Sequence, residues 1–434
     1  MKTTWIDLTD ISVWSGHHTG TQRVVYQIAK RYHGKPNVKY FVFNPKQNTF
    51  HEHSFDGILE QVESSGLRSD EHVQPAMSRT TRIKHVLIST YKKSPEGLRK
   101  KITPERRKQV KKVYKRLKHV IIPHKQPYII PTTPALTFSS DDTLLIMGKP
   151  WDYPSFIETL RKEKIDNNFK IVQVVYDLIP VFFPHLFGLA LFKPYVQHMF
   201  ETAAISDGLL AISESTKKDM QRFCNEMFIP CPPIHVIRLG DDFAKATPMK
   251  PGIKVERDNY ILCVGTIEVR KNHQLLYTTY KLGLSKGIKM PKLVIVGGKG
   301  WYTSDILFEF AHDPQMKDLV YIMHHANDNE LKWLYENCKF TIYPSVYEGW
   351  GLPVAESLAY GKLCLSSNIS SMPEIAGSLI DYFSPYDSGE CLRVIEKYLD
   401  HRTLQTKEVE IANRYTAVTW DETYKKVTSV LSKY

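Results

Sequence analysis

Short apolar runs alternate with segments of helical period over most of the chain. From about residue 258 onward, runs of four or five apolar or β-branched residues are separated by stretches in which apolar residues recur at helical spacing. This alternation is typical of parallel strands that are joined by crossover helices. It predicts strands at Tyr260–Val264, Leu293–Val296, Val320–Met323 and Phe340–Tyr343, and helices that begin near Lys271, Thr303, Asp328 and Leu352.

The N-terminal half shows the same alternation less regularly, and a basic stretch at about 50–140 interrupts it. Its apolar runs predict strands at Thr4–Leu8, Lys39–Phe43, Leu144–Met147, Ile171–Tyr176 and Leu209–Ile212, and helices after Gly20, Pro154 and Ser213. We therefore predict an α/β protein in which two Rossmann-like domains face each other across a cleft. The expected parts are an N-terminal domain (1–245), a C-terminal domain (255–405) and a C-terminal helix (406–434) that packs back towards the N-terminal domain.

Length and composition place the chain among soluble globular proteins. The 434 residues are 42% hydrophobic and 24% charged, and they contain no low-complexity tract. An aspartate, Asp7, stands where a signal peptide needs its apolar run, and no window approaches 18 uncharged apolar residues. We expect a cytoplasmic protein.

The positive charge is concentrated in one segment. The formal net charge is +12, whereas residues 79–125 contain 17 lysines and arginines against Glu96 and Glu105, a local charge of +15. Apolar residues recur at helical spacing within this segment, which predicts a basic amphipathic helix. Such a helix either lies on the anionic inner face of the cell membrane, as a peripheral contact, or packs on its own domain. No nucleic acid motif accompanies the charge, so we expect no nucleic acid partner.

The cysteines and acidic residues do not form a metal-binding pattern. The six cysteines include no C-x-x-C pair, so we expect reduced and mostly buried thiols. No D-x-D triplet occurs either, which disfavours a fold that chelates a metal to bind a diphosphate. We expect no resident metal and no resident cofactor.

The strongest chemical signal is a loop that follows the predicted strand Phe340–Tyr343. It carries Glu348, two glycines at Gly349 and Gly351, and then a helix in which Pro353 is near the first position and Glu356 follows. Glycines let the backbone approach a ligand closely, and ligands of open α/β sheets bind beyond the carboxyl ends of strands. The two oxygens of Glu356 suit a vicinal diol such as a ribose, although the helix dipole alone also favours an early glutamate.

Glu348 and Glu356 are separated by seven residues, and this spacing resembles the E-x7-E motif of family 4 glycosyltransferases of the GT-B fold. Five other segments are similar to that family, which includes mannosyltransferases of bacterial polysaccharide and O-antigen synthesis. These segments are Gly20–Arg23, Tyr176–Pro180 with Ala211–Ser215, Val264–Asn272 and Leu363–Gly377. The resemblance covers nearly the whole chain except about 50–140.

The resemblance implies a nucleotide-sugar donor in the C-terminal domain and an acceptor in the N-terminal domain. By this similarity Arg270 and Lys271 bind the diphosphate, Glu348 contacts the donor sugar and Glu356 the ribose. The implied catalytic residues are Glu348, Arg270, Lys271 and Asp177. The implied donor-binding residues are Gly20, Thr266, Arg270, Lys271, Glu348, Gly349, Trp350, Gly351, Leu352 and Glu356.

Several roles stay open at this point. Asp177 either acts on the donor or caps the turn that follows its strand, and Arg23 either meets a phosphate across the cleft or faces solvent. Trp151 and Asp152 combine an aromatic face with a carboxylate at the end of a predicted strand, as a sugar acceptor site would. A Trp at such a position is more often part of a core.

The family resemblance implies transfer with retention of anomeric configuration and without a divalent cation. The similarity of Tyr176–Pro180 favours GDP-mannose as donor over UDP- and dTDP-sugars, and the expected acceptor is a glycan or a lipid-linked glycan. Two alternatives remain: a non-catalytic GT-B binding or scaffold protein, and another sugar-nucleotide enzyme on the same fold, such as an epimerase.

Overall fold

The computed structural model describes residues 2–13, 20–59, 131–153, 155–187, 189–241 and 247–434. Two compact units make up the chain: Met1–Phe55 with Ile129–Tyr434, and Asp56–Tyr128. Nearly all of the second unit, including the basic segment 79–125, lies outside the described residues, so the predicted amphipathic helix stays a prediction. The first unit contains two β-sheets.

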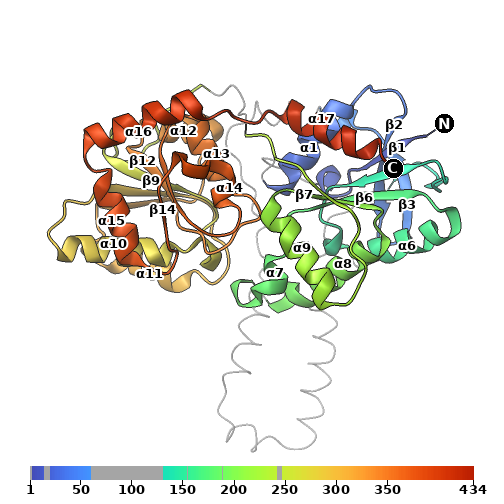
Figure 1. Ribbon diagram of the computed structural model, residues 1–434, viewed down its shortest axis with the longest axis horizontal. Helices are drawn as coiled ribbons and strands as arrows, with labels where there is room; N and C mark the ends of the chain where they lie inside the picture. The colour runs from blue at the N-terminus through green and yellow to red at the C-terminus, as the bar shows by residue number, and fades with distance from the viewer. Residues whose placement is uncertain (1, 14–19, 60–130, 154, 188, 242–246) are drawn as a thin grey trace, which may run out of the picture. The chain divides into compact units, whose positions relative to one another are not determined.

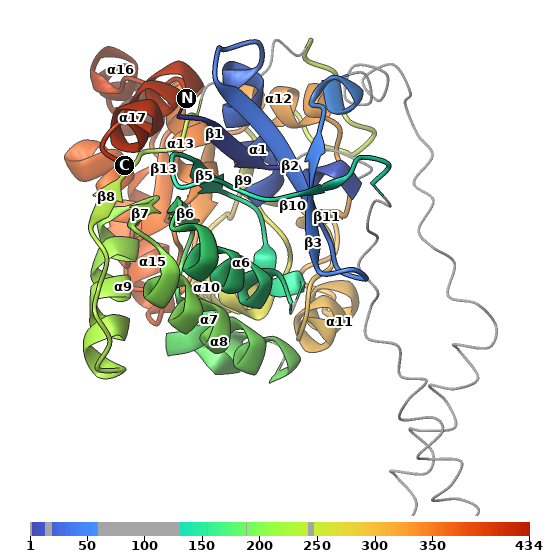
Figure 2. The same cartoon turned by 90° about the vertical axis from the view of Figure 1, so that its right-hand side faces the viewer.

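The first sheet of this unit is mostly parallel. Within the described ranges it has eight strands in the order β4-β3-β2-β1-β5-β6-β7-β8. The strands are β1 (Thr4–Asp7), β2 (Val38–Asn44), β3 (Thr49–His53), β4 (Ala135–Leu136), β5 (Thr143–Ile146), β6 (Lys170–Val175), β7 (Gly208–Ala211) and β8 (Ile234–Val236). The five strands predicted in this half are confirmed to within two residues at either end. Figure 2 shows β1, β2 and β3 side by side.

The edge of this sheet corrects one expectation. The stretch at about 50–140 was expected to interrupt the fold, but its two ends belong to the sheet. β3 pairs antiparallel with β2, and β4 pairs antiparallel with β3. Phe50 of β3 is fully buried, so the apolar side chains of this edge strand contribute to the core.

The second sheet is parallel throughout the described residues and has the order β11-β10-β9-β12-β13-β14. Its strands are β9 (Tyr260–Val264), β10 (Lys292–Val296), β11 (Val320–Met323), β12 (Phe340–Tyr343), β13 (Cys364–Ser367) and β14 (Tyr382–Phe383). The four predicted strands are confirmed, three of them at both ends and β10 with one extra residue. β9 and β12 are neighbours at the centre, which brings the loops after their carboxyl ends together.

Helices cover both faces of each sheet (Figure 1). With the first sheet lie η1 (Ile11–Val13), α1 (Thr21–Tyr32), η2 (Pro150–Asp152), α6 (Phe156–Asn167), α7 (Ile179–Phe182), η3 (Pro184–Leu186), α8 (Leu189–Ile205) and α9 (Glu214–Glu226). With the second lie η4 (Val269–Lys271), α10 (His273–Ser285), α11 (Ser304–His312), α12 (Asp328–Asn337), α13 (Leu352–Ala359), α14 (Met372–Ala376), η5 (Gly377–Leu379), α15 (Ser388–Lys397) and α16 (His401–Arg414).

The last helix, α17 (Trp420–Leu431), lies against the first sheet's helix layer. It packs on α1, where the rings of Tyr32 and Tyr424 are 4.7 Å apart and the Tyr32 hydroxyl is 2.7 Å from that of Thr428. A capping box of Thr419 and Glu422 starts this helix. The chain therefore ends beside the domain in which it began (Figure 1).

One helix start differs from the expectation. α10 begins at His273 rather than near Lys271, because Asn272 adopts a left-handed conformation with φ 58°. Arg270 and Lys271 instead form a short 3-10 turn, η4, just before the helix. Their side chains are placed by this turn and not by the first turn of an α-helix.

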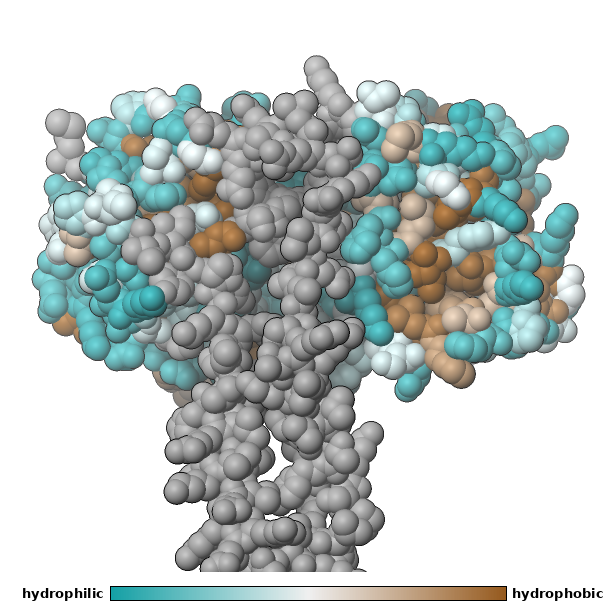
Figure 3. Space-filling model, turned by 180° about the vertical axis from the view of Figure 1, so that it is seen from behind, coloured by the Kyte–Doolittle hydropathy of each residue, from teal (hydrophilic) through white to brown (hydrophobic). Residues whose placement is uncertain are grey.

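The surface of the described part is largely polar. Figure 3 shows mostly hydrophilic residues on the face seen from behind, with hydrophobic residues gathered in one region at the right. Exposed large apolar side chains include Phe228, Phe308 and Tyr386. Among the described helices none is both long and apolar enough to cross a membrane.

The core of the first sheet is rich in aromatic rings, and Phe138 is central to it. Its ring lies 5.2–5.7 Å from those of Trp5, Phe41, Phe50 and Phe169. Substituting Phe138→Ala should lower the free energy of unfolding by about 3–5 kcal/mol, because it removes a ring and leaves a cavity. Phe308→Ala is the control, because the Phe308 side chain is 62% exposed. This substitution should change the free energy of unfolding by less than about 1 kcal/mol. Denaturant unfolding followed by circular dichroism measures both; equal effects would contradict this view of the core.

Candidate active site

The loop between β12 and α13 carries the candidate site, and its glycines allow close packing. Gly351 has φ 118° and stands immediately before α13, a conformation that L side chains rarely adopt. Gly349 has no room for a side chain, because a Cβ there would lie 2.2 Å from the carbonyl oxygen of Tyr176. The loop therefore lies directly on the backbone that follows β6.

Glu348 is the electrostatic centre of this loop. Its Oε2 is 2.5 Å from Nη1 of Arg270, and its Oε1 is 2.7 Å from Nζ of Lys271. The hydroxyl of Tyr343 donates a further hydrogen bond of 2.9 Å to Oε1. Glu348 is only 7% exposed. Burial alone would raise the pKa of Glu348, but Arg270 and Lys271 outweigh it and hold the pKa at about 2.

The two basic residues that should bind a diphosphate are therefore both paired with this carboxylate. Their side chains are 14% and 13% exposed. Arg270 also contacts Glu268 at 2.7 Å and donates to the carbonyl oxygen of Tyr347. Any anion that binds Arg270 and Lys271 has to compete with Glu348 for them. The structure thus brings together Glu348, Arg270 and Lys271, as the sequence predicts.

Thr266 and Gly265 form the neighbouring edge of the site. Both follow β9, and Thr266 is exposed. A Cβ at Gly265 would lie 3.6 Å from Cε of Lys271, so the Lys271 side chain runs along this loop. A ligand that contacts Lys271 can also contact the Thr266 backbone.

Glu356 lies on the buried face of α13. The hydroxyl of Tyr335 donates a hydrogen bond of 2.8 Å to its Oε2, and Nη1 of Arg23 is 3.6 Å from its Oε1. Burial raises the pKa of Glu356, while Arg23 and Tyr335 oppose that rise. Arg23, which the sequence left between a phosphate contact and solvent, thus lies beside a carboxylate. Gly20, exposed with φ 54°, begins the helix that carries Arg23.

Asp177 performs the structural role that the sequence left open. Its Oδ1 accepts a hydrogen bond of 3.0 Å from the backbone N–H of Ile179, at the start of α7. Burial raises the pKa of Asp177 to about 6, although the positive charge of Arg270 lowers it. Asp177 therefore caps a turn, and the charge of Arg270 favours its ionised form.

Further contacts to the loop come from residues that sequence reasoning missed. The hydroxyl of Tyr347 donates to both oxygens of Asp219, at 3.0 and 2.8 Å, and Thr216 Oγ1 lies 3.4 Å from the carbonyl oxygen of Gly349. Ser371 Oγ donates to the carbonyl oxygens of Glu348 and Trp350. Thr216 and Asp219 lie outside the motifs, because they contact the loop across 133 and 128 positions of the sequence. The backbone around Glu348 is therefore contacted by α9 on one hand and by the residue before α14 on the other.

The other loop residues contribute mainly backbone. Trp350 is buried, and the Arg238 guanidinium lies 5.4 Å from the centre of its ring. Leu352 is the first residue of α13. Their backbone groups, rather than their side chains, are the parts that can meet a donor.

Trp151 and Asp152, the residues expected to bind the acceptor, lie on η2. The Trp151 ring contacts Tyr195 at 5.1 Å and His198 at 5.3 Å, and it packs on a buried cluster. Burial raises the pKa of Asp152, while Lys149 lowers it. Trp151 is thus a half-buried residue packed on the core, as a Trp at such a position usually is. An acceptor role for Trp151 and Asp152 stays a prediction.

The thiols agree with the expectation of free cysteines. Cys224, Cys263, Cys338, Cys364 and Cys391 are buried and unbridged, and Cys231 is exposed. Across the described residues, no three His, Cys, Asp or Glu side chains gather in a way that could hold a metal ion.

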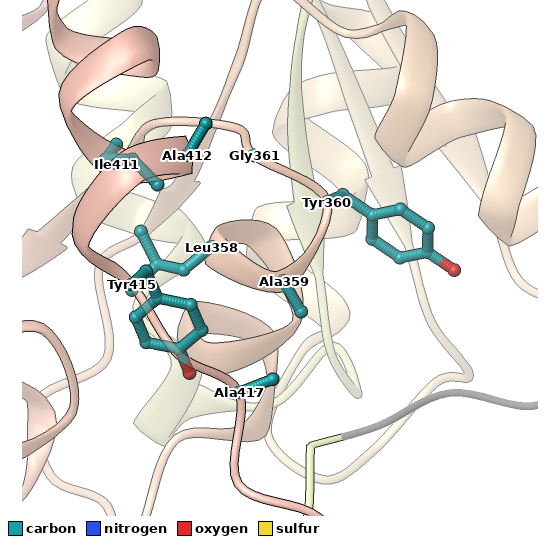
Figure 4. A pocket seen from close by; sticks show the side chains of 8 residues that line it. All are labelled: Leu358, Ala359, Tyr360, Gly361, Ile411, Ala412, Tyr415 and Ala417. Atoms are coloured by element: carbon teal, nitrogen blue, oxygen red, sulfur yellow. The ribbon is translucent and has the colours of Figure 1, made fainter.

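A small pocket of about 330 Å³ lies elsewhere, between the end of α13 and α16 (Figure 4). Its lining residues, which carry no charged side chain, are Leu358, Ala359, Tyr360, Gly361, Ile411, Ala412, Tyr415 and Ala417. An uncharged pocket cannot neutralise a diphosphate, so we do not regard it as the donor site.

Comparison with known proteins agrees with this geometry. The family model described as "Glycosyl transferases group 1" matches residues 245–414, which contain β9 to α16 and the loop of Glu348. The crystal structure of HepE from Anabaena in complex with UDP and glucose aligns over 100% of both chains, with a TM-score of 0.59 and 13% identity. The chain has the GT-B fold, and its residues 245–414 match the model of the group 1 glycosyl transferases.

Curated relatives of this chain include Escherichia coli proteins that are named as mannosyltransferases. O-antigen chain mannosyltransferase B is 29% identical over 155 residues, which are 36% of this chain and 38% of that protein. The serotype-specific mannosyltransferase WbdA is 29% identical over 246 residues, 54% of this chain and 30% of that protein. The chain thus spans about a third of the length of these two relatives.

The contacts of Glu348 generate a stability prediction. Glu348→Gln leaves Arg270 and Lys271 close together and largely buried, so it should lower the free energy of unfolding by about 3–5 kcal/mol at pH 7. Added inorganic pyrophosphate should stabilise the variant more than the wild type, because it no longer competes with the carboxylate. Thermal unfolding with and without pyrophosphate measures both effects.

This stability difference should depend on pH. The folded protein lowers the pKa of Glu348 from its ordinary value of 4.5 to about 2. The ionised carboxylate therefore stabilises the fold fully above pH 4.5, and this stabilisation is lost as the pH falls towards 2. The difference in the free energy of unfolding between wild type and Glu348→Gln should therefore become smaller as the pH falls from 4.5 to 2. Glu336→Gln, which removes a half-buried partner of Lys332 at 3.8 Å, is the control and should show neither effect. A constant gap from pH 4.5 to 2 would contradict the assigned ion pairs.

Proposed function

We propose that the chain is a retaining hexosyltransferase that moves mannose from GDP-mannose to a glycan or lipid-linked glycan acceptor in surface polysaccharide synthesis. The observation that carries this proposal is the cluster of Glu348, Arg270 and Lys271 where the loops after β9 and β12 meet. The names of the two Escherichia coli relatives support mannose as the sugar. The UDP-glucose complex of HepE supports a nucleotide sugar as the ligand class.

In this proposal the donor lies along the loops after β9 and β12. Arg270 and Lys271 bind the diphosphate, with the backbone N–H groups of 349–351 as additional donors. Glu348 exchanges one of its ion pairs for a hydroxyl of the donor sugar, and Glu356 accepts hydrogen bonds from the ribose. Glu348 and Glu356 thus both bind the donor, and each already has basic partners: Arg270 and Lys271 for Glu348, and Arg23 for Glu356.

The proposed reaction needs few side chains that transfer protons. The bond between the sugar C1 and the diphosphate oxygen breaks, a bond from C1 to the acceptor oxygen forms, and the acceptor's hydroxyl proton moves to the leaving diphosphate. Arg270 and Lys271 stabilise the negative charge that grows on this diphosphate. They supply positive charge without a divalent cation, which this proposal therefore does not require. Asp177, beside Arg270, is kept as a candidate for positioning the donor.

The proposed acceptor indicates where in the cell the enzyme acts. A lipid-linked glycan is held at a membrane, so we propose a cytoplasmic enzyme that acts at the inner face of the cell membrane. The charge of residues 79–125 supports this proposal. Those residues lie outside the described ranges.

A donor assay with Lys271→Ala tests the proposed function. We expect release of GDP from GDP-mannose by the wild type and a fall in kcat of about 100-fold in the variant, because Lys271 meets charge that develops only in the transition state. The matched control is Lys281→Ala on α10, where the lysine pairs with Asp313 at 2.7 Å outside the site. Its kcat should be unchanged. A wild type that releases no nucleotide from GDP-, UDP- or dTDP-sugars, with or without acceptor glycans, would contradict the proposal.

A further inference from the structure

Tyr335 fixes the carboxylate that α13 contributes to the site. Its hydroxyl donates a hydrogen bond of 2.8 Å to Oε2 of Glu356, and the two residues are 1% and 8% exposed. Tyr335 lies on α12 and Glu356 on α13, with β12 between them in the chain. The hydrogen bond therefore joins α12 to α13.

The tyrosine ring cannot easily move. Tyr335 belongs to a buried cluster with Tyr260 and Leu334, and it stacks on Tyr360 at 5.2 Å between ring centres and 14° between planes. Figure 4 shows the Tyr360 ring turned away from Leu358 and Tyr415. Because the core holds the Tyr335 ring, its hydroxyl is a fixed donor.

A glutamate needs such a donor to present its oxygens in one direction. The terminal torsion of a Glu side chain is broad, so an unrestrained carboxylate rotates. Its two oxygens offer about four acceptor positions, and Tyr335 occupies one of them on Oε2. Burial raises the pKa of Glu356, and the Tyr335 hydrogen bond and the Arg23 charge favour the ionised form. Nη1 of Arg23 lies 3.6 Å from Oε1, and the acceptor positions that neither residue occupies suit two adjacent hydroxyl groups.

We propose that Tyr335 is a positioning residue for nucleotide recognition, which orients Glu356 towards the vicinal diol of the donor's ribose. This inference rests on the proposed function, in which Glu356 meets the ribose. Tyr335 itself does not touch the ligand. It acts through the hydrogen bond to Oε2, so its loss should affect only ligands that carry the diol.

The test compares two nucleotides on two matched variants. GDP and 2′,3′-dideoxy-GDP are titrated by calorimetry into wild type, Tyr335→Phe and Tyr260→Phe. Tyr260 is the control, because its hydroxyl is also buried in the same cluster but donates to the carbonyl oxygen of Leu334 at 2.7 Å. In Tyr335→Phe the Kd of GDP should rise about tenfold, as expected when a hydrogen bond to a charged group is lost. The Kd of dideoxy-GDP should stay unchanged, and Tyr260→Phe should alter neither.

The outcomes separate this inference from the proposed function. A wild type that binds no GDP and no UDP would remove the proposed function and this inference with it. A wild type that prefers GDP to its dideoxy form, with a Tyr335→Phe variant that keeps the same preference, would overturn only the role of Tyr335. Equal weakening of both nucleotides would also overturn it, because that is the effect of a merely structural change.

A second comparison avoids dependence on one variant. Glu356→Gln removes the buried charge, so Tyr335→Phe in that background should lower GDP affinity no further. Thermal unfolding shows that each variant is folded, and the double variant gives the comparison even where Tyr335→Phe alone is unstable. An additive loss in the double variant would overturn the proposal.

Discussion

The carboxylate of Glu348 balances the two positive charges at the centre of the candidate site. Two largely buried cations, Arg270 and Lys271, lie within 2.7 Å of it, and neither could stay charged at low cost without a partner. The same carboxylate anchors the loop to β12 through the Tyr343 hydroxyl. A ligand that replaces it must bring comparable negative charge, and a nucleotide diphosphate does so.

The loop around Glu348 depends on contacts from distant parts of the chain. Thr216 and Asp219 reach it from α9, and Ser371 from the segment before α14. Gly349 is the point at which this packing permits no side chain, because the Tyr176 carbonyl occupies that space. The position of one carboxylate thus depends on both sheets and on the helices that flank them.

The sequence predicts the site residues that stand in short motifs, but not those that contact the site from distant positions in the chain. The predicted strands match because apolar runs between helical segments carry a strong periodic signal, and the two glutamates and the Arg-Lys pair belong to short motifs. Tyr335 could not be identified, since it stands 21 residues before Glu356 in a helix whose apolar pattern marks it only as a core residue. The start of α10 was misplaced because a left-handed Asn272 has no periodic signature. β3 and β4 were missed because they are only 5 and 2 residues long, too short for a clear periodic pattern.

In the proposed mechanism, Arg270 and Lys271 supply the positive charge that a metal would otherwise provide. Product analysis by NMR, on mannose transfer from GDP-mannose in excess EDTA, tests this central claim most directly. We predict full activity and a product whose anomeric configuration is that of the donor. An inverted product, or activity that EDTA abolishes and manganese restores, would contradict the claim.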